Sequence, residues 1–301
     1  MDYKNKLKEQ IEALCKNKIH MKICTSQKDV PIGQSKFGGK PHLPKGFQWY
    51  YYEGEGINKK VKNRPLSFLA QINCREIHSF DKDKLLPDEG ILYFFYELDT
   101  MSWGYDPKDV GSARVYYFSG SEKELTVTEF PEDLEEDYKM PELAIEFSSV
   151  ISLPDYQEAD DLLEMDCMEQ EIMEALDEDT ELDIYDIYED ITKEFGYQQP
   201  KDTLTGLLGY AELIQNPIPV ECELVSNGFY AGGGWPKMSA KEKADLMEKA
   251  KEWVLLFQLD TVETDDFCLM FGDCGSIYYY IRKQDLKNHR FDRIWLVLQC
   301  Y

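Results

Sequence analysis

Two distant stretches of the chain repeat the same series of strand-like segments. The segment FLAQIN (68–73) resembles LLFQLD (255–260), and GILYFFY (90–96) resembles GSIYYYI (275–281). Further on, RVYYF in the first stretch is similar to RIWLV in the second. Short apolar runs rich in aromatic and β-branched residues are typical of β-strands. The pattern therefore predicts an old tandem duplication in which each half contains the same strand–turn–strand unit.

The negative charge of the chain is concentrated between these two stretches. Residues 129–194 contain 26 acidic residues against two lysines, a net charge of −24, whereas the whole chain carries −25. Within this range, apolar residues recur at intervals of three and four, which is the spacing of an amphipathic helix. We expect two such helices, with apolar stripes formed by Leu162, Met165, Met168, Ile172 and Leu176 and by Ile184, Ile187, Ile191 and Phe195.

These patterns predict an α+β protein with a body rich in antiparallel strands. The body would be built from two duplicated halves, with peripheral helices and an acidic helical insert between the halves. The 301 residues, of which 43% are hydrophobic, are enough to bury one large core. We expect one compact unit that comprises an N-terminal helix at 1–18, a first β-rich half at 19–130, the insert at 131–199 and a second β-rich half at 200–301.

The composition argues against several classes of protein. The chain has no apolar leader and no run of about 18 apolar residues, so we expect neither a signal peptide nor a membrane span. The eight cysteines lack a CxxC pair, which favours reduced thiols, a cytoplasmic location and no metal site. Nucleic-acid binding needs clustered lysine and arginine, whereas the charge outside the acidic range is almost balanced. We therefore expect no nucleic acid and no membrane among the partners. We expect no cofactor, and the oligomeric state stays open.

The segment GDCGS (272–276) raises the question of a reactive cysteine. Cys274 has no signature of a nucleophile around it, and the matching place in the first stretch holds PDEG instead. Aspartate and glycine are typical turn residues, so we expect a hairpin corner that joins strands near 267–271 and 276–281. We interpret Asp273 as fixing this turn, with a ligand contact as the alternative.

Two pairs of polar residues interrupt the apolar strands at matching positions. They are Gln71 with Asn73 in the first half and Gln258 with Asp260 in the second. Residues two apart in a strand point to the same side, and a buried amide or carboxylate needs hydrogen-bond partners. Each pair either satisfies nearby loop backbone or lines a polar cleft between the halves. For the cleft, the expected ligand-binding residues are Gln71, Asn73, Trp103, Gln258, Asp260 and Asp273, and no catalytic residue is assigned.

Several ordered motifs resemble the YwqG-like family. They include FGGKPHLP (37–44), LLGYAELIQ (207–215), MFGDCGSIYYYIRKQDL (270–286) and FDRIWLVLQC (291–300), and the resemblance spans nearly the whole chain. It implies a bacterial cytosolic domain of unknown function with an antiparallel α+β body, and it supplies no reaction. Members of this family often have alanine where this chain has Cys274. Some relatives occur near contact-dependent toxin systems, so the resemblance opens an inhibitor or immunity role.

Two hypotheses about function compete. The first is a non-enzymatic binding or protein-interaction module whose acidic insert attracts a basic protein partner. The alternative is an enzyme or small-molecule sensor that uses a polar cleft between the halves. The two differ in geometry, because the cleft requires both polar pairs to converge on one open pocket. The lack of a recognisable catalytic set in the sequence favours the first hypothesis.

Overall fold

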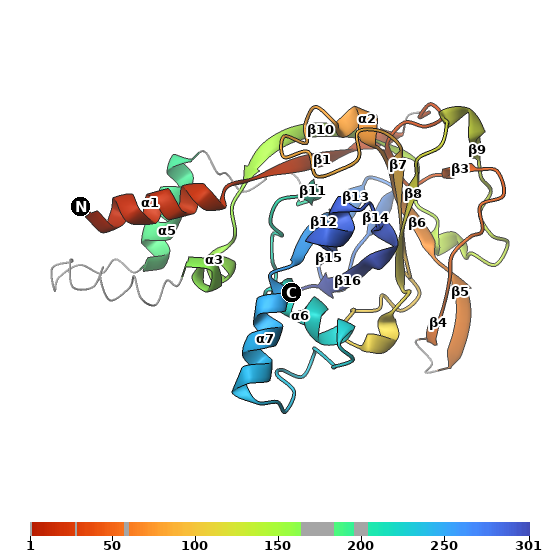
Figure 1. Cartoon of the computed structure of the whole chain (residues 1–301). Helices are drawn as coiled ribbons and strands as arrows, with labels where there is room; N and C mark the ends of the chain where they lie inside the picture. Colours follow the sequence, from red (N-terminus) through yellow and green to blue (C-terminus); the bar gives the residue numbers. More distant parts are fainter. Residues whose placement is uncertain (1, 28, 57–59, 164–183, 196–203) are drawn as a thin grey trace.

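One antiparallel sheet forms the body of the protein in the computed structural model, which describes residues 2–27, 29–56, 60–163, 184–195 and 204–301. Its strands are β1 (Lys16–Gln27), β2 (Lys36–Phe37), β6 (Ser67–Asn73), β7 (Ile91–Tyr96), β8 (Ala113–Phe118), β10 (Leu143–Ser152), β11 (Gly206–Leu208), β12 (Trp253–Asp260), β15 (Ser276–Arg282) and β16 (Ile294–Gln299). They lie in the order β16-β15-β12-β11-β1-β10-β2-β6-β7-β8. The sheet curls until its edge strands β8 and β16 approach each other, which gives an almost closed cylinder (Figure 1).

Shorter elements surround this sheet. Three small antiparallel pairs are formed by β3 (His42–Pro44) with β9 (Leu125–Val127), β4 (Tyr51–Glu55) with β5 (Val61–Pro65), and β13 (Val262–Thr264) with β14 (Phe267–Leu269). The helices are α1 (Asp2–Leu14), α2 (Cys74–Ile77), α3 (Tyr156–Leu163), α5 (Ile184–Glu194), α6 (Ile218–Ser226), α7 (Ala240–Ala250) and α8 (Lys283–Lys287). None of the helices in the described ranges has the length and apolar character that crossing a bilayer requires. The predicted α+β fold with an antiparallel body is confirmed.

The strands on the two sides of the sheet form two three-stranded units with matching geometry. The first unit is β6-β7-β8 and the second is β12-β15-β16, and neighbouring strands are antiparallel in both. Gln71 faces Tyr93 across β6 and β7, and Gln258 faces Tyr278 across β12 and β15. Both β6 and β12 have a bulge shortly before the glutamine. The two stretches that resemble each other in sequence therefore pair in the same way.

Aromatic side chains fill the space between the two units. The ring centroid of Phe94 lies 4.4 Å from that of Phe257 and 5.4 Å from that of Tyr279. The hydroxyl of Tyr279 donates a hydrogen bond to the carbonyl of Phe95 at 3.0 Å. All three facing rings are fully buried in the main apolar cluster, where aromatic pairs add about 0.5–1.5 kcal/mol each to the gain from burial. The units thus meet through a packed core.

The centre of the sheet is formed by segments that are far apart in the chain. Strand β1 lies between β10 and β11, and it pairs with β10 in a long antiparallel ladder. We expected a helical insert over 131–199, but strand β10 lies in the first part of that range. The first α-helix described there is α3, which follows β10. The segment LAIEFSSVIS (143–152) alternates Ile145 and Phe147 with polar neighbours, which is a strand pattern. Its position among acidic residues obscured that pattern.

Helices α1, α3 and α5, here called the helical extension, form a separate apolar cluster beside the sheet (Figure 1). Leu7 and Ile11 of α1 pack with Ile187 and Ile191 of α5. In the stripe predicted for α5, Ile187 and Ile191 are therefore buried and Phe195 is partly buried. The stripe predicted for 162–176 lies mainly outside the described residues. We expected the N-terminal helix and the acidic range as separate segments of the chain, but they share one small core.

The GDCG segment forms a tight turn, as predicted, but it does not join the two strands of a hairpin. The amide of Gly275 donates a hydrogen bond to the carbonyl of Phe271 at 2.9 Å, which closes the turn. The strands on either side pair elsewhere, because β14 pairs with β13 and β15 pairs with β12 and β16. Asp273 and Cys274 are exposed, and Cys274 has a φ of 49°, which is uncommon for a residue other than glycine.

Replacing Gly275 with valine should destabilise the protein more than replacing Cys274 with alanine. A Cβ atom at Gly275 would lie 2.3 Å from the carbonyl oxygens of both Phe271 and Gln299, so the backbone would have to move. We expect a loss of about 3 kcal/mol in the free energy of unfolding for the valine variant and about 1 kcal/mol or less for the alanine variant. Urea denaturation measures both changes, and equal midpoints would contradict this account of the turn.

Candidate functional site

Gln71 holds the segments on either side of β2. Its side chain accepts a hydrogen bond from the amide of His42 at 2.9 Å and donates one to the carbonyl of Gln34 at 2.6 Å. The hydroxyl of Tyr93, which faces Gln71 across the strands, donates to the carbonyl of His42. Gln71 is fully buried, so loop backbone satisfies both ends of its amide.

Gln258 holds the loop that follows β11 in the same way. Its side chain accepts a hydrogen bond from the amide of Glu212 at 3.0 Å and donates one to the carbonyl of Glu212 at 3.3 Å. The hydroxyl of Tyr278 donates to the same carbonyl at 2.8 Å. Two glutamine–tyrosine pairs thus fasten two loops at matching positions. This geometry favours the interpretation that the glutamines satisfy nearby loop backbone.

Asn73 and Asp260 are also bonded to backbone within their own halves. Asn73 donates to the carbonyl of Gly33 at 2.7 Å and accepts from the amide of Arg75 at 3.0 Å, which caps α2. Asp260 accepts a hydrogen bond from the amide of Leu204 at 3.3 Å. Both side chains therefore position backbone at the end of an inner strand.

The part of the chain that the structure describes does not gather the six predicted ligand residues into one pocket. Gln71 lies on the outer side of the first unit and Gln258 on the outer side of the second, with the aromatic core between them. Trp103 is 42% exposed in the loop before β8, and Asp273 is exposed in the turn before β15. A ligand-binding role for the set stays a prediction, and these hydrogen bonds favour the structural role.

A buried lysine directly before FGGKPHLP forms a second polar group with its neighbours, which sequence reasoning did not identify. The ammonium of Lys36 is fully buried, where it pairs with Glu142, donates to the carbonyl of Lys40 at 2.6 Å and lies 3.4 Å from Nε2 of His42. Burial lowers the pKa of His42 to about 4, and burial also lowers the pKa of Lys36 although Glu142 opposes that shift. The amide of Gly33 donates to Nδ1 of His42 at 3.2 Å, so the neutral ring carries its proton on Nε2 and does not accept a hydrogen bond from Lys36. Glu142 and the carbonyl of Lys40 are therefore the groups that hold the buried ammonium of Lys36.

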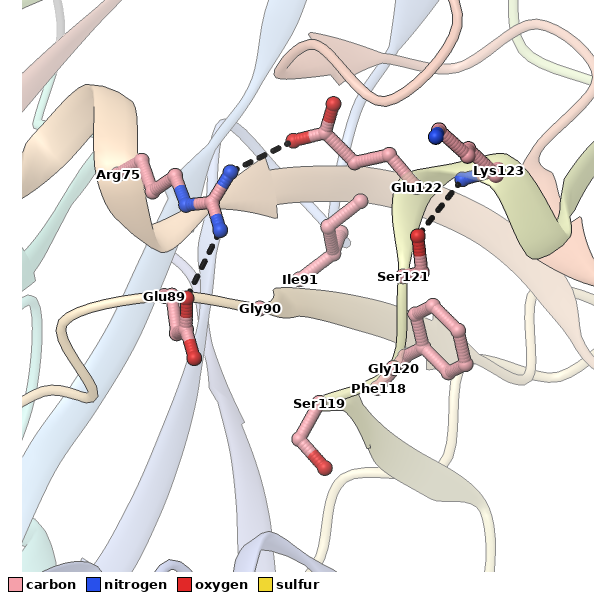
Figure 2. A pocket seen from close by; sticks show the side chains of 10 residues that line it. All are labelled: Arg75, Glu89, Gly90, Ile91, Phe118, Ser119, Gly120, Ser121, Glu122 and Lys123. Atoms are coloured by element: carbon pink, nitrogen blue, oxygen red, sulfur yellow. Dashed lines mark hydrogen bonds and ion pairs between the residues drawn. The ribbon is translucent and has the colours of Figure 1, made fainter.

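A pocket of about 480 Å³ opens where α2, the turn before β7 and the segment after β8 meet (Figure 2). The guanidinium of Arg75 lies between two carboxylates, at 2.8 Å from Glu89 and 3.6 Å from Glu122. Ser119 and Lys123 contribute a hydroxyl and an ammonium to the lining. The pocket can therefore offer both positive and negative groups to a ligand.

Apolar side chains complete this pocket. Ile91 and Phe118, at the ends of β7 and β8, are buried beneath the charged groups. Both residues belong to the outer apolar cluster of the first unit, and the two strands hold them in fixed positions. The site thus combines a rigid apolar base with exposed charges, which is the usual make-up of a small-molecule pocket.

The second unit has a matching corner without these charges. The strand pairing ends at Asn73 and Ile91 in the first unit and at Asp260 and Ser276 in the second. Counted on from these ends, Arg75 of α2 stands at the place of Val262 of β13, and Glu89 stands at the place of Cys274. At the corner of the second unit, Tyr301 lies against the GDCG turn, because its amide donates a hydrogen bond to the carbonyl of Asp273 at 3.0 Å. The two corners share their strand pairing and differ in charge and in access.

Our sequence reasoning missed the residues of the pocket. They come from a short helix and two turns, and no motif connects them. The usable signal was the contrast between PDEG and GDCG at matching positions, which we interpreted only as evidence for a shared turn. Asn73, which was predicted as a site residue, lies behind the pocket and caps the helix that carries Arg75.

Fold and pocket together define an α+β protein with a curled antiparallel sheet, two matching three-stranded units and a charged pocket at Arg75. Within the described ranges, no three His, Cys, Asp or Glu side chains come together as metal ligands would. The chain belongs to the family described as a domain of unknown function, DUF1963, whose model matches residues 35–300. Helix α1 and strand β1 precede the matched range. No curated protein matches the chain.

Proposed function

We propose that this protein is a non-enzymatic binding module that holds a small charged molecule in the pocket at Arg75. The difference between the two matching corners carries this proposal. Arg75 and Glu89 stand where the second unit has Val262 and Cys274, so the same strand pairing forms without them. Charged residues that the fold does not need, placed around an open pocket, are best explained by a ligand.

The ion pairs of the pocket are weak enough to exchange with a ligand. The side chains of Arg75, Glu89 and Glu122 are all more than half exposed. Exposed ion pairs contribute only about 0–1 kcal/mol, because water screens the charges and long side chains lose freedom when they pair. A ligand that offers comparable partners can replace them at little cost, while Ile91 and Phe118 keep the base of the pocket in place.

A thermal-shift screen of charged metabolites tests this proposal. A ligand of the pocket should raise the melting temperature of the wild type and of Arg290→Gln, and it should fail to do so for Arg75→Gln. Arg290 is the matched control, because it is an exposed arginine paired with Asp292 at 3.0 Å and lies outside the pocket. Failure of a broad panel to stabilise the wild type, or equal stabilisation of all three proteins, would overturn the proposal.

The charge distribution supports a second candidate, in which the acidic insert binds a basic protein partner. Residues 164–183 contain ten acidic residues and no basic one. Next to them, Asp190 on α5 is exposed, whereas Glu194 already accepts a hydrogen bond from Lys8 at 2.6 Å. Clustered carboxylates attract basic partners and speed the encounter with them.

This second candidate is best tested by removing charge and keeping the helices. Deletion of 155–195 would expose Leu7 and Ile11, which pack against α5, so loss of binding would have two explanations. Replacing the ten acids of 164–183 with glutamine or asparagine leaves that packing intact. Affinity capture should then lose basic partners, whereas neutralising the exposed Asp245 and Glu248 of α7 should not. Unchanged partners in the first variant would contradict the idea.

Three finer statements join these proposals. We propose that the two units arose by internal duplication, which their matching pairing and their glutamine–tyrosine pairs support. We also propose that the chain is a YwqG-like protein of the bacterial cytoplasm, on the strength of its motifs and of the free thiols of its described cysteines. An inhibitor or immunity role is one form that binding can take. The enzyme alternative draws no support from the polar pairs, because backbone groups already satisfy them.

A further inference from the structure

We infer that the pocket at Arg75 takes a zwitterion of the amino-acid type, with an ammonium and a carboxylate on one small molecule. This inference rests on the proposed binding function and names the class of ligand. It follows from how the charges of the pocket are arranged and from which of them have partners.

The charges of the pocket are balanced in number and unevenly paired. Arg75 has two carboxylates beside it, those of Glu89 and Glu122. The ammonium of Lys123 has no ion-pair partner, and the hydroxyl of Ser119 makes no hydrogen bond, within the described residues. One side of the pocket thus has more carboxylate than its cation needs, and another side has an unpaired cation.

A ligand with one kind of charge fits this arrangement poorly. An anion would pair with Lys123 or Arg75 and would at the same time lie near two carboxylates, and a cation would meet the opposite conflict. Like charges at short distance cost free energy and are a common means of rejecting a ligand. A zwitterion avoids the conflict, because each of its groups has a partner of opposite sign.

A zwitterion can replace the ion pairs that it disrupts in the pocket. A ligand carboxylate can accept two parallel hydrogen bonds from the guanidinium of Arg75, and it can receive a further one from Ser119 or Lys123. Glu89 or Glu122, released from Arg75, can then accept hydrogen bonds from the ligand ammonium. The exchange replaces pairs between exposed protein groups with pairs to the ligand, and each charge of the ligand gains a partner of opposite sign.

The apolar base of the pocket narrows the class further. Ile91 and Phe118 offer contact to an apolar side chain, and about 480 Å³ is ample room for an aromatic amino acid. Phenylalanine is therefore a suitable probe. Two analogues lack one charge each and keep the same ring, namely 3-phenylpropanoate without the ammonium and 2-phenylethylamine without the carboxylate.

Isothermal titration of the full-length protein with these three compounds tests the inference. We expect phenylalanine to bind about tenfold or more tightly than either analogue, because each analogue leaves one charged side of the pocket unpaired. Arg75→Gln should reduce the affinity for phenylalanine and for 3-phenylpropanoate. The double variant Glu89→Gln, Glu122→Gln should reduce the affinity for phenylalanine and for 2-phenylethylamine. Arg290→Gln, outside the pocket, should change none of these values.

The possible outcomes separate the inference from the proposed function. If 3-phenylpropanoate or 2-phenylethylamine binds as tightly as phenylalanine and Arg75→Gln or the double variant abolishes that binding, the zwitterion is wrong and the binding function stands. If phenylalanine binds equally to wild type and to both pocket variants, it binds elsewhere and the inference fails. If neither these probes nor the metabolite panel binds the wild type, both statements fail. Tight binding of phenylalanine that both pocket variants weaken supports both.

Discussion

Replacing Glu221 with glutamine should raise the free energy of unfolding at pH 7 by about 3 kcal/mol and should flatten its dependence on pH. Glu221 is only 9% exposed on α6, and its Oε2 has no hydrogen-bond partner among the described residues. Burial raises the pKa of this carboxyl from 4.5 to about 8. The charged form is therefore disfavoured in the folded protein, and glutamine removes the need to ionise.

The sign of the pH dependence follows from the raised pKa of Glu221. Below about pH 4.5 the carboxyl is protonated in both the folded and the unfolded chain, and its effect on stability is neutral. Between about pH 4.5 and pH 8 the unfolded chain releases the proton while the folded chain keeps it. The free energy of unfolding of the wild type should therefore fall as pH rises through this window, by roughly 1.4 kcal/mol per pH unit at the steepest.

Glu223 gives a matched control in the same helix. It is 2% exposed, but its carboxylate accepts a hydrogen bond from Nε1 of Trp253 at 3.0 Å and forms an ion pair with Arg282. Glu223→Gln should therefore destabilise the protein, by about 3 kcal/mol, because it breaks a buried ion pair. Urea denaturation at pH 5 and pH 8 measures both variants. If wild type and Glu221→Gln lose the same stability between these pH values, Glu221 is not the buried acid described.

Replacing Gly104 with alanine should lower the free energy of unfolding by about 4 kcal/mol or more, a large part of the roughly 5–15 kcal/mol typical of a folded domain. An added Cβ would lie 1.8 Å from the carbonyl oxygen of Leu296, and the φ of Gly104 is 81°. This residue lies in the loop that covers β16, where the amide of Leu298 donates to the carbonyl of Trp103 at 3.0 Å. The substitution would push that loop away from the edge of the sheet.

Gly228→Ala separates the two causes of the destabilisation expected for Gly104→Ala, which are the positive φ and the close contact with β16. Gly228 has a similar φ of 85°, but nothing lies within 4 Å of an added Cβ. We expect a cost of about 1–2 kcal/mol there, from the backbone conformation alone. Chemical denaturation of both variants gives the difference, which measures the close approach of Gly104 to β16. Similar losses for the two would show that the backbone angle, and not the contact, dominates.

The parts of the fold that the sequence predicted are those formed by neighbours in the chain. FLAQIN with GILYFFY, and LLFQLD with GSIYYYI, become β6 with β7 and β12 with β15, because each pair of strands lies within one stretch of the chain and is marked by apolar runs and turn residues. The centre of the sheet was not predicted. Strands β1, β10 and β11 pair over long separations, and pairing of that kind leaves no local pattern.

Some residues of the candidate site were also predicted from the sequence, whereas others were missed. The positions of Gln71 and Gln258 were found, because polar residues in apolar strands stand out, but their partners are backbone groups that a sequence does not reveal. Sequence reasoning did not single out Lys18 and Lys36, although both are buried. Arg75 and Lys123 look like any surface cation, and the pairing of the neighbouring strands β6, β7 and β8 brings them to one pocket.

The place of β1 at the centre of the sheet has a consequence for how the protein is made. Its ladder partners lie in β10 and β11, and Lys18 pairs with Leu208, about 190 positions later. A ribosome adds about 5–20 residues per second, so β1 leaves the tunnel roughly 10–40 s before that partner exists. Strand β10 is synthesised before β11, so β1 keeps one unpaired edge even after β10 has been made, and α1 is uncovered until α5 follows. An unpaired edge favours aggregation, so we expect a chaperone to shield the nascent chain until these partners have been synthesised.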